Sequence, residues 1–119
     1  MLNLNLVVAQ GTVTYLDTTA EPLFSLPAGA IPLFAVVQTE TAFNDSGTDL
    51  VQIGKGTDND YYASGISVAA TGGQLIMLNQ SGALTAQAQI TATFTGQNSD
   101  ATAGRAKVNL VYATPFYPV

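Results

Sequence analysis

Apolar and polar residues alternate along much of this chain, most clearly in two runs near its end. In the run AQAQITATFT, which begins at Ala86, every second residue is apolar and the residues between are Gln or Thr. The run RAKVNLVYA repeats the pattern, with apolar residues at every second position from Ala106 to Tyr112. Successive side chains of a strand point to opposite faces, so each run predicts a strand with one buried and one solvent-exposed face. The polar segment GQNSDATAG between them predicts a loop that joins the two strands as an antiparallel hairpin.

Similar runs predict strands along the rest of the chain, separated by breaks rich in Gly, Pro, Asn and Asp. Gln10-Gly11 is one such break, and it divides two of the predicted strands. The further runs are residues 2–8, 12–16, 23–26, 31–43, 48–54, 61–69 and 74–78. Eight or nine strands at this spacing, without a helix of useful length, predict an all-β fold, a single antiparallel β-sandwich that is jelly-roll-like. We expect one domain over residues 1–119, with short apolar N- and C-terminal arms.

Four local features refine this picture. Pro27-Ala28-Gly29 predicts a type II turn, and Gly65 predicts a bulge inside its strand. The run Leu33 to Val37 is apolar on both sides, as expected for a strand covered on both faces or lying inside an assembly. The tail TPFYPV after Ala113 contains two prolines and two aromatics, so we expect it to dock on a surface rather than to pair in a sheet.

The chain carries few charges for its size. Apolar residues make up 47% of it and charged residues only 9%, against about a quarter in an average soluble domain. Its polarity comes from Thr, Gln, Asn and Ser, whose neutral groups are easier to desolvate than charged ones. Two interpretations stay open: a surface partly buried by a partner, or a stable β domain that simply has few charges.

The net charge of −5 argues against two classes of partner. Lys55, Arg105 and Lys107 are the only basic residues, too few for a surface that follows nucleic-acid phosphates. The acidic balance also argues against anionic membrane surfaces, and no run approaches the ~20 apolar residues of a membrane span. The N-terminal MLNLNLVVAQ has the pattern of a strand rather than of a signal peptide.

Residue types that support catalysis are largely missing. The chain has no His and no Cys, which excludes Ser-His-Asp and Cys-His catalysis and any site that needs His or thiolate ligands. The eight carboxylates lie in turns or beside small polar residues, where nothing would raise a pKa for general acid catalysis. We therefore expect a protein that is not an enzyme and has no cofactor.

Two polar groupings leave alternatives open. Asp58-Asn59-Asp60 offers oxygen ligands for Ca²⁺, but Asp and Asn are also ordinary turn residues, and the long ligand loop of a calcium site is missing. Arg105 and Lys107 share the outer face of the last strand. They could protect an exposed strand edge against aggregation, or they could contact acidic groups of a partner.

Several segments occur in an order that resembles a known family. The strand after the Pro27 turn is followed by Ile53-Gly54 and then by the acidic, Tyr-containing loop from Asp58 to Tyr62. The end of the chain has Thr95-Gly96, the ATAGRA turn and a last strand ending in Tyr-Ala. Over about residues 27–113, this order is similar to that of small jelly-roll virion proteins of tailed bacteriophages, which serve as capsid cement or decoration proteins.

The resemblance implies a jelly-roll protein, assembled in the host cytoplasm, that forms a homotrimer on the outer capsid surface of the virion. Its partners would be the major capsid protein and further copies of itself. Together with the residue pattern, it makes these residues the candidates for contacts: Leu2, Leu4, Leu6, Arg105, Lys107, Phe116, Tyr117 and Pro118. The alternative is a head-fibre or tail-fibre module that binds a host receptor or glycan, with Tyr61 and Tyr62 as its platform.

Overall fold

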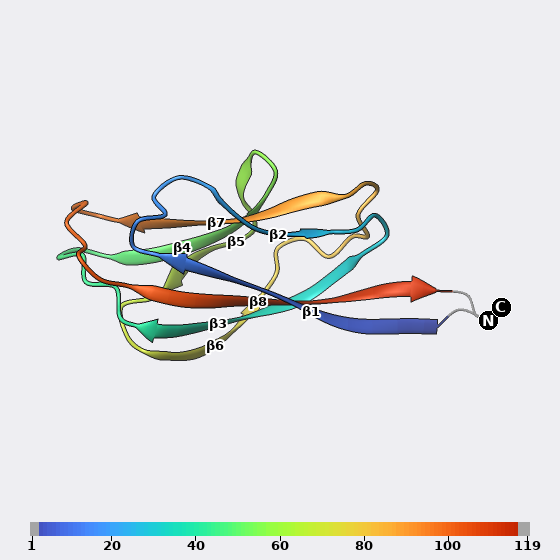
Figure 1. Cartoon of the computed structure of the whole chain (residues 1–119), viewed down its shortest axis with the longest axis horizontal. Helices are drawn as coiled ribbons and strands as arrows, with labels where there is room; N and C mark the ends of the chain where they lie inside the picture. Colours follow the sequence, from blue (N-terminus) through green and yellow to red (C-terminus); the bar gives the residue numbers. More distant parts are fainter. Residues whose placement is uncertain (1–2, 117–119) are drawn as a thin grey trace.

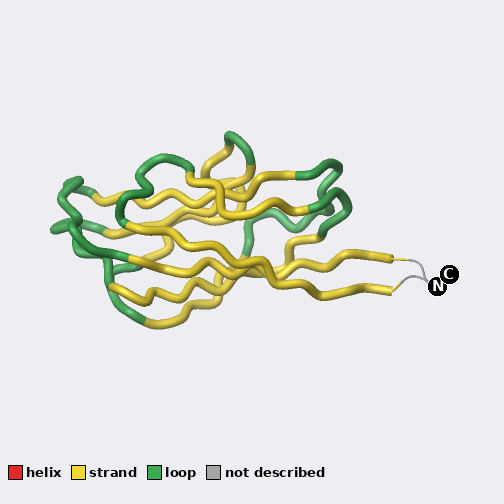
Figure 2. The backbone as a smooth tube through the Cα atoms, viewed as in Figure 1, coloured by secondary structure: helices red, strands yellow, loops and turns green. Residues whose placement is uncertain are grey.

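The computed structural model describes residues 3–116 of the chain. These residues contain eight strands and the loops that connect them (Figures 1 and 2). Within these residues no helix is long and apolar enough to cross a membrane. The first four strands are β1 (Asn3–Thr14), β2 (Glu21–Leu26), β3 (Ile31–Thr41) and β4 (Asp49–Lys55). The last four are β5 (Asp58–Ser67), β6 (Gly72–Met77), β7 (Ala88–Gly96) and β8 (Arg105–Phe116).

The strands form two antiparallel four-stranded sheets that pack face to face. One sheet has the order β1-β8-β3-β6 and the other the order β2-β7-β4-β5. Every connection except that between β4 and β5 passes from one sheet to the other, as Figure 1 shows. This is the arrangement of a jelly roll, in which two Greek keys give two four-stranded sheets. The predicted all-β sandwich is therefore confirmed, with eight strands.

The predicted hairpin of β7 and β8 is wrong. β7 lies between β2 and β4, whereas β8 lies between β1 and β3 in the opposite sheet. Alternation reveals that each strand has one apolar face, but an apolar face is buried equally well whether two strands pair or oppose each other across a sandwich. Residues 97–104 cross between the sheets instead of closing a hairpin.

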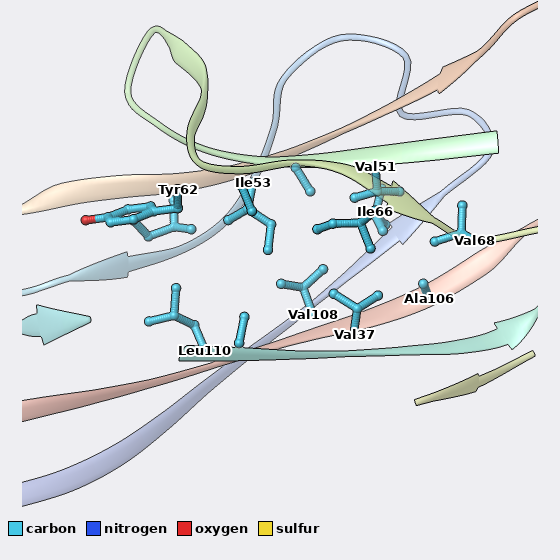
Figure 3. Close-up of a cluster of buried hydrophobic side chains, with 14 of the residues drawn as sticks. Val37, Val51, Ile53, Tyr62, Ile66, Val68, Ala106, Val108 and Leu110 are labelled. Atoms are coloured by element: carbon cyan, nitrogen blue, oxygen red, sulfur yellow. The ribbon is translucent and has the colours of Figure 1, made fainter. Parts of the chain in front are cut away.

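The core fills the space between the sheets with side chains from both inner faces (Figure 3). β8 contributes Val108 and Leu110, and β7 contributes Ile90 and Phe94, all of them buried. The expected inner faces of these two strands are thus confirmed. The other fully buried large side chains include Val13, Leu26, Val37, Val51, Ile53, Tyr62 and Val68.

The predicted turn at Gln10-Gly11 is absent, because β1 continues through both residues. A side chain at position 11 would place its Cβ 2.7 Å from the Cβ of Leu23. Glycine is therefore needed for the close approach of Leu23, a residue of β2 in the other sheet, and not for a turn. This one difference reduces nine predicted strands to eight.

Two local predictions are confirmed. The N–H of Ala30 donates a hydrogen bond to the carbonyl of Pro27 at 3.2 Å, and Gly29 has φ of +87°, as a type II turn requires. Gly65 has φ of +67° and lies where the β4–β5 register shifts. A bulge there needs a residue that tolerates positive φ.

β1 and β8 extend beyond the sandwich as a two-stranded arm, clearly visible in Figure 2. β3 pairs with β8 only as far as the pair Ile31–Ala113, while β1 pairs with β8 up to Asn3–Phe116. The prediction that the tail after Ala113 would not pair is therefore wrong for residues 114–116. Beyond Ala113 β8 pairs only with β1, so it accommodates Pro115 as an edge strand does.

The predicted solvent-exposed face of β7 is also wrong in part. Thr91 and Thr93 are buried, and their hydroxyl oxygens have no hydrogen-bond partner among the described residues. Thr91 is paired with Gly54, over which the backbone of Asp58 and Asn59 folds closely. The start of β5 thus folds over the outer face of the sheet beside Thr91, which a strand-by-strand pattern cannot reveal.

Candidate functional site

The outer face of the β1-β8-β3-β6 sheet carries a row of apolar side chains that crosses all four strands. The strand register aligns Val8 with Val111, Val111 with Phe34, and Phe34 with Met77. Val8 and Met77 are well exposed, and the two central side chains are half-buried. Their neighbours Ala35 and Leu110 point into the core and are fully buried, so the row itself faces outward.

The next row is half apolar and half polar. It consists of Gln10, Asn109, Val36 and Leu75, in the order of the strands. Gln10 Nε2 donates to Asn109 Oδ1 at 2.6 Å, and Asn109 Nδ2 donates to the Val36 carbonyl at 3.2 Å. These bonds fix the amides across three strands. The face thus changes from apolar to polar within two rows.

The apolar end of this face continues into the arm. Leu4 and Leu6 extend the series begun by Val8 along β1, and Leu6 is 69% exposed. At the opposite edge of the sheet, the row that crosses the strands ends at Met77 of β6, which is 73% exposed. We call this continuous surface, from the arm to β6, the apolar face. Its exposed area is on the order of several hundred Å², the size at which a patch marks an interaction site.

The structure answers one of the two explanations of the doubly apolar run Leu33 to Val37, because within residues 3–116 the strand is not covered on both faces. Ala35 and Val37 lie in the core, but Phe34 and Val36 point outward and Leu33 is exposed as well. Within residues 3–116, one face of β3 is therefore covered by the opposite sheet, while the other keeps exposed apolar side chains.

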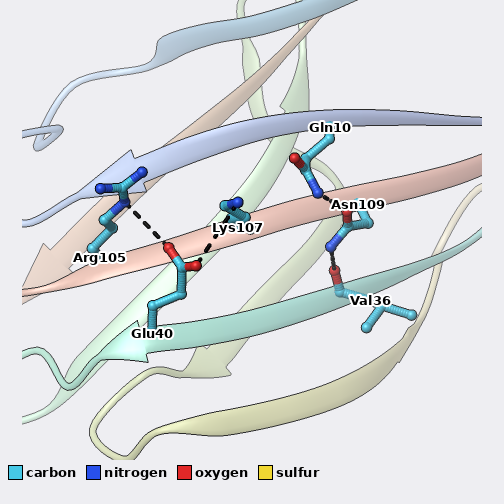
Figure 4. A network of polar contacts seen from close by, with 6 residues as sticks. All are labelled: Gln10, Val36, Glu40, Arg105, Lys107 and Asn109. Carbon is cyan, nitrogen blue, oxygen red and sulfur yellow. Dashed lines mark hydrogen bonds and ion pairs between the residues drawn. The ribbon is translucent and has the colours of Figure 1, made fainter.

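The opposite end of the same face is charged (Figure 4). Arg105 Nε lies 3.2 Å from Glu40 Oε1, and Lys107 Nζ lies 3.8 Å from Glu40 Oε2. Both cations lie on β8, which is a central strand, whereas the edges of this sheet are β1 and β6. The idea that they protect a strand edge is therefore wrong. They instead join β8 to β3 through one carboxylate and leave part of their surface exposed.

Tyr61 and Tyr62 do not form a two-ring platform. Tyr62 is 1% exposed and lies in the core, whereas Tyr61 is half-buried with Lys55 Nζ 4.1 Å from its ring centroid. Burial, with a smaller contribution from Tyr61, raises the pKa of Tyr62 to about 12. The two rings contact each other edge to face, with centroids 4.8 Å apart, but only the ring of Tyr61 reaches the surface.

Asp58, Asn59 and Asp60 are exposed and form the start of β5, so the predicted polar loop ends at Thr57. Residues 3–116 contain no group of three or more His, Cys, Asp or Glu side chains that could hold a metal ion. The pocket lined by Tyr15, Phe94 and Ser99 has a volume of about 240 Å³ and contains hydroxyls but no titratable carboxylate. The described residues thus offer surfaces for contact more clearly than chemistry for catalysis.

A hydrogen-bonded cluster holds together the two loops at one end of the sandwich. The Asp45 carboxylate accepts the N–H groups of Gly47 at 2.7 Å, Asn98 at 3.0 Å and Asp100 at 3.0 Å. Burial raises the pKa of Asp45, but these backbone donors outweigh that effect and hold the pKa below its ordinary value of 3.8. The carboxylate therefore acts as a fixed structural anion.

The predicted contact residues are divided between these features. Leu4 and Leu6 lie on the apolar face, and Phe116 ends β8 opposite Asn3. Arg105 and Lys107 lie at the charged end of the outer face of the same sheet. Leu2, Tyr117 and Pro118 lie outside the described residues. The residues that were missed are Phe34, Val36, Leu75, Met77 and Val111, and runs that are apolar on both strand faces were the signal that could have revealed them.

The two sheets define a jelly roll, and chains in solved structures of phage capsids share this fold. The chain is similar to a chain in the capsid asymmetric unit of cyanophage Pam1, with a TM-score of 0.73 and 17% identity over 93% of this chain and 86% of that one. A chain from the acidic stable capsid of Helicobacter pylori bacteriophage KHP30 matches with a TM-score of 0.69 and 12% identity. The match covers 99% of this chain and 100% of that one. A chain from the Ralstonia phage GP4 capsid matches with a TM-score of 0.69 and 13% identity. The match covers 92% of this chain and 84% of that one. No family model and no curated protein matches the sequence. At these identities the likeness establishes the fold.

Proposed function

We propose that this chain is a structural virion protein that decorates a phage capsid and stabilises it by binding between major capsid proteins. The apolar face is the observation that carries the proposal, because a sandwich that acts alone has no need of exposed apolar side chains on all four strands of one sheet. The similarity in fold to chains of three phage capsids supports the same assignment.

Burial of apolar surface would supply the binding energy. Each Å² removed from water contributes about 25 cal/mol before the costs of association are subtracted. One face of several hundred Å² is smaller than the ~800 Å² that each partner contributes to a standard interface. Many copies on a repeating lattice, each with a modest contact, would together stabilise the shell.

A homotrimer is part of the proposal. The apolar face offers each copy two ends, with Leu4 and Leu6 at the arm and Leu75 and Met77 at β6. One end can therefore contact a sister copy while the other contacts the capsid. In this arrangement the protein assembles in the host cytoplasm, takes its place on the outer capsid surface, and carries out no catalysis.

The decisive experiment adds the purified protein to capsids of its own phage that were assembled without it. The proposal predicts saturable, stoichiometric addition and a higher melting temperature of the capsids. Failure to bind capsids, combined with saturable binding to host polysaccharide, would establish the fibre-module alternative. The burial of Tyr62 counts against that alternative, because only Tyr61 remains for a sugar to stack on.

Light scattering or mass photometry tests the trimer separately. The trimer predicts a mass three times the 12.3 kDa of the chain across a range of concentrations. A protein that stays monomeric at high concentration and still binds capsids would contradict the trimer and leave the decoration role intact.

A further inference from the structure

The few charges of this chain are unevenly placed over its surface. The outer face of the β1-β8-β3-β6 sheet carries Arg105, Lys107 and Glu40, an excess of one positive charge. The other seven carboxylates lie in loops or in the opposite sheet: Asp17, Glu21, Asp45, Asp49, Asp58, Asp60 and Asp100. On a chain of net charge −5, this face is the one that an acidic surface repels least.

The Arg105 side chain has unused hydrogen-bonding capacity. Its Nε contacts Glu40, while no ion pair of its terminal nitrogens occurs in the described part of the chain. The side chain is 56% exposed, and in Figure 4 the terminal nitrogens point away from Glu40. A guanidinium presents its donors as a planar fork that fits a carboxylate. The geometry at Arg105 therefore suits an incoming carboxylate without breaking the contact to Glu40.

The spacing between the apolar and the cationic ends is fixed by one strand. Val111, Asn109, Lys107 and Arg105 are alternate residues of β8, so all of them lie on the outer face. A strand rises about 3.3 Å per residue, which puts Lys107 about 13 Å and Arg105 about 20 Å from Val111. A surface that fits this face has to present apolar groups and carboxylates at this separation.

We propose that the outer face of the β1-β8-β3-β6 sheet docks on a protein surface that combines an apolar area with carboxylates about 13–20 Å away. This inference rests on the proposed function, under which the surface belongs to the major capsid protein. Burial of Val8, Phe34 and Met77 supplies the affinity. The cations at the edge of the contact fix its orientation and speed association, as charges at the rim of an interface do.

One pair of variants tests the apolar part of the contact. Leu75→Ser and Met77→Ser, combined, remove exposed side chains of the apolar face, and Leu16→Ser removes a side chain of similar exposure, 72%, from the loop after β1. We expect the double variant to bind capsids about tenfold more weakly, equivalent to about 1.4 kcal/mol, and Leu16→Ser to bind like the unmodified protein. Melting temperatures of the free proteins verify that all of them fold.

A second pair tests the charged part. Arg105→Glu reverses a charge on the proposed contact, and Lys55→Glu makes the same change in β4 of the opposite sheet. Arg105→Glu should slow association with capsids several-fold at low salt, with a smaller effect at high salt, whereas Lys55→Glu should change the rate little. Equal effects of the two variants would overturn the assignment of the charged end.

The outcomes separate this inference from the proposed function. If the unmodified protein does not bind capsids, the decoration role itself fails. If it binds and the Leu75/Met77 variant binds equally well, the role stands and the docking face is wrong. If that variant instead converts an oligomer into a monomer in solution, the face contacts a second copy of the chain, and the proposal is also overturned.

Discussion

The carboxylate of Asp45 accepts the backbone N–H of Asn98 at 3.0 Å, across 53 positions of sequence. The bond joins the loop between β3 and β4 to the loop between β7 and β8, which come from strands in different sheets. Gly96 makes the approach possible, because a Cβ there would lie 2.5 Å from Asp45 Oδ2. This cluster holds the two sheets together at the end remote from the arm.

Replacing Asp45 with Asn should weaken that end of the sandwich. Asn has one acceptor oxygen where Asp has two, and its amide NH₂ would oppose a backbone N–H that now donates to Oδ2. We expect a melting temperature lower by several degrees, and faster hydrogen exchange at the amides of Asn98 and Asp100. The exposed Asp58→Asn is the matched control and should change neither quantity.

Acid should destabilise the fold partly through the same residue. The pKa of Asp45 is lower in the folded protein than its ordinary value of 3.8, so the folded state binds fewer protons there than the unfolded state. The contribution of Asp45 to stability is therefore complete above that value and is lost as the pH falls through the folded pKa. Urea unfolding below about pH 5 should show this decline. An Asp45→Asn variant that declines as steeply as the unmodified protein would contradict the assignment.

The alkaline limit should depend on Tyr62. The pKa of Tyr62 rises from 10.0 to about 12 on folding. Its contribution to the stability of the folded state is therefore complete below pH 10 and is lost as the pH rises toward 12. Tyr62→Phe should remove this part of the alkaline decline and the absorbance change of tyrosine near pH 12. At neutral pH the variant should be as stable as the unmodified protein or up to about 1 kcal/mol more stable, since the buried hydroxyl has no partner among the described residues.

Gly54 should not tolerate a side chain. A Cβ there would lie 2.7 Å from the Cα of Asn59, and backbone atoms cannot rotate away as the end of a side chain can. We expect Gly54→Ala to cost about 1–3 kcal/mol in urea unfolding, as overpacking does. At Gly82 a Cβ would meet open space, so Gly82→Ala should leave stability unchanged or raise it slightly. Equal effects of the two substitutions would contradict the close contact at Gly54.

The sequence predicted the strands well because alternation directly records which side of a strand is buried. The inner faces around Ile90 and Val108 follow from alternation alone. The identity of each strand's partner does not follow from alternation, because long-range pairing leaves no local signal in the sequence. For this reason β7 and β8 were wrongly paired with each other. Gly11 was mistaken for a turn because a glycine required by a neighbour looks the same in sequence as a glycine required by positive φ.

The candidate site was only partly predictable. Leu4 and Leu6 were predicted because β1 alternates so regularly, and the run from Leu33 to Val37 indicated a strand with two apolar faces. That Phe34 and Met77 belong to one surface could not be predicted, since it depends on the register of β3 with β6. The two tyrosines were judged by residue type, and only the three-dimensional structure showed that the ring of Tyr62 is in the core.

The position of β8 determines when this protein can fold during its synthesis. β8 leaves the ribosome after the other seven described strands, yet it lies inside its sheet, between β1 and β3. Until it emerges, no strand joins β1 to β3, and the rows of the apolar face cannot extend across the whole sheet. Folding must therefore follow the completion of β8, and pairing over so many residues makes it slow, on the order of milliseconds to seconds. Until then the edges of β1 and β3 that face β8 stay unpaired, and unpaired strand edges are places where other chains can add.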